Sequence, residues 1–145
     1  MEAKNELSKQ FKQSQEKYRY YIIGLSVACI GYAIHRTSGL GIDWLQLPVG
    51  LAILFWGVSI FLGFLTIKYH LSIIYANHAM LKIKDGTMEE VGNHPSIIKA
   101  ALSGVMSAID QNNAKAHRYS GWQEVLFYLG MVSFIVWHVL VMAVN

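Results

Sequence analysis

The chain alternates apolar runs with polar segments, and three of the apolar runs carry no charged residue. These uncharged runs cover residues 20–35, 44–67 and 125–145. A transmembrane helix needs about 20 consecutive, mostly apolar residues, so the runs predict helices that cross a bilayer. We expect an all-α, polytopic membrane protein with three transmembrane helices and a cytoplasmic helical hairpin. The predicted spans are 20–36, 48–67 and 122–144.

The second span is predicted to continue as a helix beyond the membrane. Residues 64–85 contain neither Gly nor Pro, so nothing interrupts the helical pattern before Gly86. Some 40 residues at about 1.5 Å each make a rod of roughly 60 Å, about twice the hydrocarbon thickness. We expect residues 68–84 to extend into the cytoplasm and residues 85–94 to form a connector.

A returning amphipathic helix is predicted over residues 95–118. Pro95 suits the first turn of a helix, and Asn112 and Asn113 are expected to end it. Its apolar residues follow helical spacing: Ile98, Ala101, Leu102, Val105 and Ile109. The extension of the second helix should cover this apolar face through residues that share one side: Leu71, Ile74, His78 and Leu81. The two helices together would form the cytoplasmic hairpin.

The N-terminal segment, residues 1–19, reads as an amphipathic cytoplasmic helix with Leu7 and Phe11 on one face. It either lies on the membrane surface or runs straight into the first span. Residues 25–29 come near a lipoprotein cleavage box, but Ser26 stands where that box has an aliphatic residue, so an uncleaved span is expected. Residues 37–47 form the outer loop.

The distribution of charge predicts the orientation. Of 145 residues, 54% are hydrophobic and only 14% charged, against about 25% charged in soluble domains. Five Lys and Arg precede the first span, six lie between the second and third, and only Arg36 lies on the other side. The positive-inside rule therefore places the N-terminus and the long loop in the cytoplasm and the C-terminus outside. A bacterial inner membrane is the expected location. The net charge of +3 suits anionic headgroups and requires no nucleic-acid partner.

The residues offer little for catalysis or metal binding. The uncharged runs hold no Asp, Glu or Lys for ion-coupled transport, and the candidates His35 and His138 both lie near the outer edge, where an interfacial hydrogen-bonded role is expected. His70 and His78 are eight residues apart, not the four that place two metal ligands on one helical face. No nucleophile stands in a triad spacing, and no glycine-rich phosphate loop occurs. We expect no enzyme activity, no cofactor and no metal, and keep a lipid-modifying membrane enzyme as the less favoured alternative.

A stripe of mostly small or hydroxyl-bearing residues follows the second span at alternating spacings of four and three. Its members are Ala52, Trp56, Ser59, Gly63, Thr66 and His70, and its extension reaches Asn77. Lipid tails do not reward such side chains, so this face should meet protein or water. It either packs against the small residues of the first span, namely Gly24, Ala28 and Gly31, or lines a pore between several copies of the second helix.

The leading functional expectation is a homo-oligomer whose second helix lines an ion-conducting or membrane-permeabilising pore. The hairpin would gate it through a cytoplasmic protein or small ligand, as in a bacterial membrane effector. The alternative is a non-conducting anchor or adaptor subunit whose hairpin docks a cytoplasmic partner. In both, the lipid bilayer is the surrounding partner.

Overall fold

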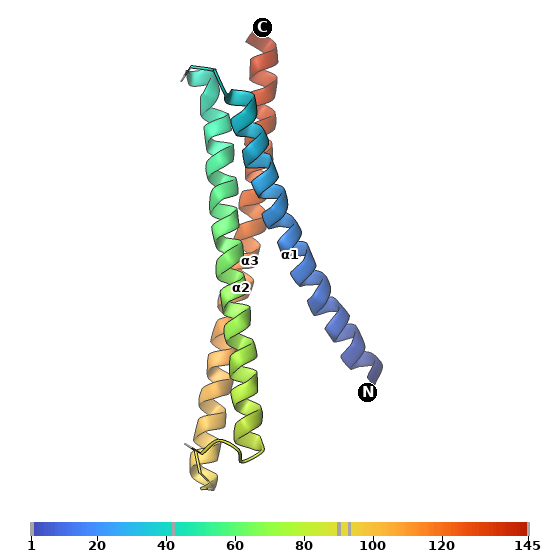
Figure 1. Ribbon diagram of the computed structural model, residues 1–145, viewed down its shortest axis with the longest axis vertical. Coiled ribbons are helices and arrows are strands. Elements are labelled where there is room, and N and C mark those ends of the chain that lie inside the picture. Colours follow the sequence, from blue (N-terminus) through green and yellow to red (C-terminus); the bar gives the residue numbers. More distant parts are fainter. Residues whose placement is uncertain (1, 42, 90, 93, 145) are drawn as a thin grey trace. The chain divides into compact units, whose positions relative to one another are not determined.

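The computed structural model describes residues 2–41, 43–89, 91–92 and 94–144. Three long helices account for most of them: α1 (Glu2–Thr37), α2 (Leu47–Lys84) and α3 (Pro95–Val144) (Figure 1). A single 3-10 turn, η1 (Trp44–Gln46), precedes α2, and the described part contains no strand. The all-α prediction is therefore confirmed.

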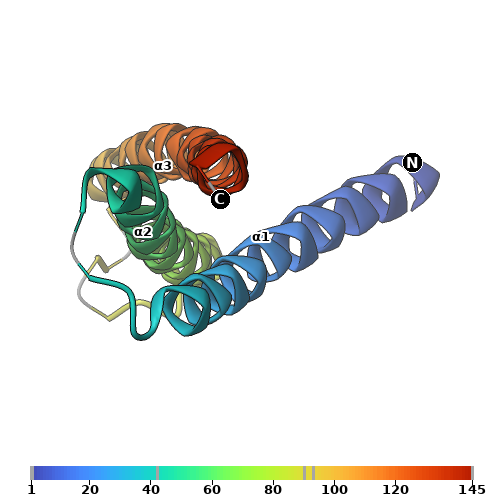
Figure 2. The same cartoon turned by 90° about the horizontal axis from the view of Figure 1, so that it is seen from above.

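The helices form two compact units. The first, which we call the three-helix unit, comprises Met1–Gly63 and Ser120–Asn145, and the second, the hairpin unit, comprises Phe64–Tyr119. In the three-helix unit, the C-terminal half of α1 lies beside α2 and α3, whereas its N-terminal half leads away from them (Figure 2). The side chains of Leu7 and Phe11 are accordingly more than 60% exposed.

Two helical segments in the described part are long and apolar enough to cross a membrane: Trp44–Lys84 and Pro95–Val144. α1 does not reach the same hydropathy, because its uncharged run is short and contains Tyr20, Tyr21 and Tyr32. The structure thus supports two of the three predicted spans.

α2 agrees with the prediction that one helix leaves the second span without a break. Pro48 lies in its first turn, where a missing N–H has no cost. Its end is a Schellman motif: the amide of Thr87 donates to the carbonyl of Lys82 at 3.0 Å, and that of Gly86 donates to Ile83 at 3.3 Å. Gly86 takes the positive φ of 67° that this motif requires.

One predicted helix boundary is wrong, and the structure decides between two alternatives that the sequence left open. The returning helix does not end at Asn112 and Asn113, because α3 runs unbroken from Pro95 to Val144 and includes the residues given to the third span. The Asn112 side-chain amide donates to the Ser72 hydroxyl at 3.1 Å, a tertiary contact that offsets the weak helix propensity of Asn. Residues 1–19 and 20–36 belong to one helix, α1, so the N-terminal segment runs straight into the first apolar run.

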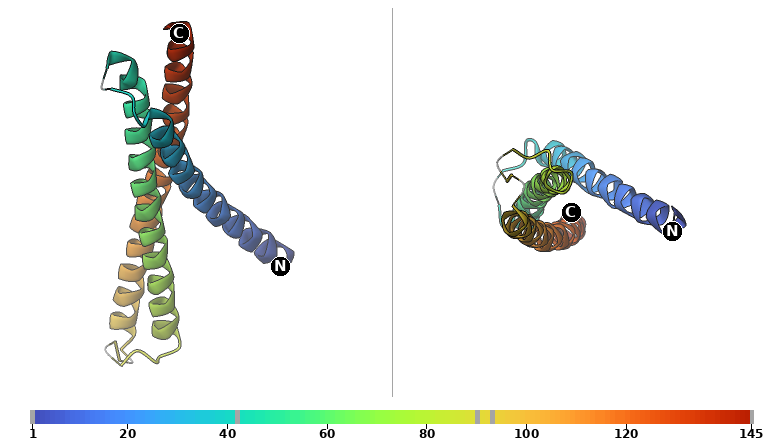
Figure 3. Two further views of the ribbon diagram at one scale, coloured as in Figure 1. Left: turned by 45° about the horizontal axis from the view of Figure 1, so that its top comes forward. Right: turned by 90° about the horizontal axis from the view of Figure 1, so that it is seen from below.

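In the hairpin unit, α2 and α3 lie antiparallel and side by side (Figure 3). The predicted apolar face of α3 is half-buried at all five positions, from Ile98 to Ile109. The predicted covering face of α2 is wrong, since Leu71, Ile74 and Leu81 are each more than half exposed. The covered positions lie on nearly the opposite side of the helix: Tyr69, Ile73, Ala76, Met80 and Ile83. The Tyr69 and Tyr119 rings stack at 5.6 Å, which fixes this rotation.

Candidate functional site

The stripe on α2 is buried within a single chain. Ala52, Trp56, Ser59 and Thr66 are between 0 and 2% exposed, and Gly63 is buried as well. In the three-helix unit, the residues that face this stripe come mainly from α3. The structure places protein against this face of α2.

Two hydrogen bonds hold the stripe to the backbone of α3. The indole N–H of Trp56 donates to the carbonyl of Phe127 at 3.2 Å, and the hydroxyl of Ser59 donates to the carbonyl of Gln123 at 2.8 Å. Both groups would be costly to leave unpaired in hydrocarbon. Each bond also requires the two helix backbones to lie close together.

Glycines make that close approach possible. A Cβ added to Gly63 would lie 2.7 Å from Gln123 Nε2 and 2.8 Å from Ile23 Cδ1, and a Cβ added to Gly130 would lie 2.5 Å from Trp56 Nε1. A larger residue would force the side chains of Gln123 and Ile23 to move at Gly63, and the rigid indole of Trp56 to move at Gly130. Gly63 and Gly130 therefore receive the bulky side chains of the opposite helix, as small residues do at transmembrane helix contacts.

The face of α3 that meets the stripe has the same repeat and was missed by sequence reasoning. Gln123, Phe127, Gly130, Phe134, Trp137 and Val141 are spaced alternately by four and three residues, and all are buried or half-buried. This repeat of 3.5 residues per turn is the pattern of helices that pack side by side in a left-handed bundle. The alternation was readable in the sequence, but the large apolar residues on every side of α3 mask it.

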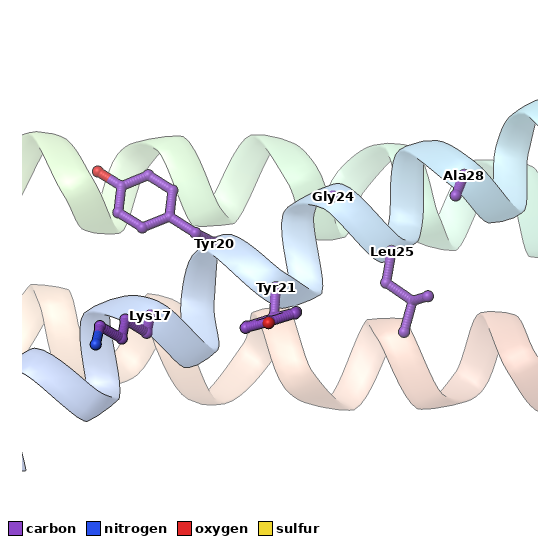
Figure 4. Close-up of a pocket in the computed structure, with 6 residues that line it drawn as sticks. All are labelled: Lys17, Tyr20, Tyr21, Gly24, Leu25 and Ala28. Carbon is purple, nitrogen blue, oxygen red and sulfur yellow. The ribbon is translucent and has the colours of Figure 1, made fainter.

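α1 packs through a different face from the one predicted to be its contact face. Its buried or half-buried positions include Arg19, Ile22, Ser26, Cys29 and Ala33, again at spacings of three and four. Gly24, Ala28 and Gly31 are exposed instead, and no atom lies within 4 Å of a Cβ added to Gly24 or Gly31. This exposed small-residue face forms a shallow apolar groove that Lys17, Tyr20, Tyr21 and Leu25 border (Figure 4). It is open to lipid or to another helix.

The remaining stripe residues belong to the hairpin unit and do not form a site there. The Nδ1 atom of His70 lies 3.1 Å from the carbonyl of Thr66, one turn back on the same helix. Asn77 is exposed. Neither residue adjoins a cluster of ligands: among the residues described, no group of three His, Cys, Asp or Glu side chains is placed to hold a metal ion.

Polar side chains are also buried where α1 meets α3. Ser26 is fully buried, and Gln123 and Arg19 are 1% and 7% exposed. The hydroxyl of Ser26, Nε2 of Gln123 and Nε of Arg19 have no hydrogen-bond partner in the protein. Burial lowers the pKa of the Arg19 guanidinium, while the carboxylates of Glu16 and Glu124 act in the opposite direction. These groups keep some polarity inside an otherwise apolar bundle.

An apolar cavity of about 310 Å³ lies between the helices of the three-helix unit. Ala28, Cys29, Trp56, Met131 and Phe134 contribute to its wall. The 3-10 turn is joined to α3, because the indole N–H of Trp137 donates to Oε1 of Gln46 at 3.1 Å. The lining offers no acid, base or nucleophile other than the Cys29 thiol and the Tyr32 hydroxyl.

These features define a class: an all-helical protein with two helices capable of crossing a membrane, packed through small residues, with a helical hairpin attached. No protein-family model, no curated protein and no solved structure matches the chain. Its function must therefore be argued from its own residues.

Proposed function

We propose that the protein is a non-enzymatic integral membrane anchor that presents its hairpin unit to a cytoplasmic partner. The observation that carries this proposal is the burial of Ala52, Trp56 and Ser59 within one chain. The small and polar face of the second span is occupied in holding the three-helix unit together. In this arrangement these residues do not contact the space between copies, where a pore would lie.

In the proposal, all three helices cross the membrane. α1 is the least apolar of them, but its contacts support a span: Ile22 and Ala33 are buried in the same core as Trp56 and Trp137. The outward side chains of all three helices are large and apolar, for example Leu25, Phe61 and Ile135, each more than half exposed. Such a surface suits acyl chains and is far larger than a soluble protein tolerates.

The orientation follows from the positive-inside rule. Eleven of the twelve Lys and Arg residues lie on the side that carries the N-terminus and the hairpin unit. The hairpin unit would then project from the inner surface of a bacterial inner membrane, and the C-terminus would face outward. This places the exposed side chains of α2 beyond Lys68 in water, within reach of soluble proteins.

A second candidate is a gated pore formed by several copies, as in a membrane effector that collapses ion gradients. Two observations favour it. The buried hydroxyl of Ser26 and amide of Gln123 lack protein partners, and such groups in a membrane are usually hydrated or functional. The exposed face of Gly24, Ala28 and Gly31 would let α1 helices of neighbouring copies approach closely. Opening of such a pore would require α2 to separate from α3.

Reconstitution separates the two functions. The full chain is placed in liposomes that contain a potassium-sensitive or proton-sensitive dye, and dye response and single-channel current are recorded. Absence of flux, together with retention of a cytoplasmic protein that a hairpin variant fails to retain, supports the anchor. Currents that the Ser59→Leu substitution abolishes would overturn the anchor and establish the pore.

A further inference from the structure

One face of α2 in the hairpin unit has no cover. Leu71, Ile74, Tyr75 and Leu81 are 51, 59, 75 and 56% exposed. We call this set the outer face. α3 cannot cover it, because α3 packs against the opposite side of α2, where Ile73 and Ile83 lie. In the topology proposed above, the outer face stands in water, where a contiguous apolar surface usually marks an interaction site.

The spacing of the outer face suits a helical partner. Three residues of the outer face, Leu71, Ile74 and Leu81, together with the exposed His78 between them, are separated by three, four and three residues. These are the a and d positions of a heptad, the pattern with which one helix receives the side chains of another. Two antiparallel helices bury only one face each, so a third helix laid on the outer face would pack against α2 from the side opposite α3.

The charge at the outer face is of one sign. Lys68 and Lys82 are exposed beside its two ends, each one residue after a heptad d position. α2 contains no Asp or Glu over its whole length. In a second copy of α2 packed in parallel, the position opposite Lys82 would be Asn77, which offers it no negative charge. A helix that carries acidic side chains at its flanks would pair with the lysines.

We propose that the outer face docks an amphipathic helix of a cytoplasmic protein, with apolar residues at its centre and Asp or Glu along both flanks. The inference rests on the anchor function proposed above and names the chemistry of its partner. The apolar seam supplies the affinity, and Lys68 and Lys82 select the charge of the incoming helix.

The test uses the full-length protein in nanodiscs of neutral lipid, with Cys29→Ser and a fluorophore on Asp85→Cys. The probe is a synthetic four-heptad helix with Leu at a and d and Glu at e and g. We expect saturable binding that a double substitution, Leu71→Ser with Ile74→Ser, weakens at least tenfold. The matched control, Ile97→Ser with Met106→Ser, removes exposed apolar side chains from α3 of the same unit and should leave binding unchanged. Circular dichroism checks that each variant is folded.

Four results would overturn the proposal. The first is that the acidic probe does not bind, and the second is that the same helix with Lys at e and g binds equally well. The third is that copies form disulfide cross-links through Tyr75→Cys, and the fourth is that a label at Tyr75→Cys is buried in anionic vesicles. The third would assign the outer face to a second copy, and the fourth to the membrane. Ion flux is measured on the same purified protein reconstituted into liposomes, so failure of docking is distinguished from failure of the anchor function.

Discussion

The Ser59 hydroxyl donates to the carbonyl of Gln123, 64 residues away, at 2.8 Å. Both side chains are at most 1% exposed, and Gly63, one turn further along α2, lies against the amide of the same Gln123. The contact joins the second span to the start of the third apolar run. In the three-helix unit the stripe, which the sequence also allowed to line a pore, is therefore a packing surface.

Leucine at Gly63 should destabilise the three-helix unit. The Gly63→Leu side chain would collide with Gln123 and Ile23, and overpacking of this kind costs about 1–3 kcal/mol. Thermal unfolding in detergent, followed by circular dichroism, measures the effect. Gly57→Leu is the matched control on the same helix, since nothing lies within 4 Å of its added Cβ. Equal melting temperatures for the two variants would contradict the packing.

Substitution of the two tryptophans in the second apolar run should have very different effects on the free energy of unfolding. Trp56 is 2% exposed, whereas Trp44 is 83% exposed. Trp56→Ala removes a buried ring and its bond to Phe127, with an expected loss of about 3–5 kcal/mol. Trp44→Ala should cost about 0.5 kcal/mol or less. Chemical unfolding in mixed micelles, followed by the fluorescence of the remaining tryptophans, provides the comparison.

The Tyr18 hydroxyl lies 3.4 Å from that of Tyr128. This hydrogen bond, with smaller contributions from desolvation and the Glu124 carboxylate, raises the pKa of Tyr18 to about 12. A raised pKa means that folding favours the neutral phenol, so its contribution to stability is present below pH 10 and is lost as the pH rises through 12. Absorbance at 295 nm should show one tyrosine titrating late in the native protein. Tyr128→Phe should move that titration to lower pH.

The small-residue face of α1 should be dispensable for folding of one chain and required for contact between copies. Gly24→Leu meets no atom within 4 Å, so the melting temperature should not fall. If α1 helices pair through this face, cross-linking at Ala28→Cys in a Cys29→Ser background should link two copies, and Gly24→Leu should abolish the link. A linked dimer unaffected by Gly24→Leu would place the contact elsewhere.

Cysteine labelling in intact bacteria tests the topology. With Cys29→Ser as background, Ser38→Cys in the loop after α1 should react with an impermeant maleimide added outside. Asp85→Cys at the end of α2 should react only after the cells are opened. Reaction of both positions from the same side would exclude α2 as a complete span.

Much of this fold is readable from the order of residues alone, because helix formation and lipid compatibility are local properties. The uncharged runs, Pro48, Pro95 and Gly86 suffice to place α2 and the start of α3. The end predicted at Asn112 failed for a non-local reason, since that side chain bonds to Ser72 on the neighbouring helix.

What only the tertiary structure decided is which faces meet. α1 carries two series at helical spacing, one through Gly24 and Gly31 and one through Ile22 and Ser26, and either would fit a close contact. On α2 beyond the membrane, the face of Leu71 and the face of Ile73 were equally plausible seams. Periodicity defines the faces of a helix, but the rotation that it adopts depends on side chains dozens of residues away, such as Gln123 and Tyr119.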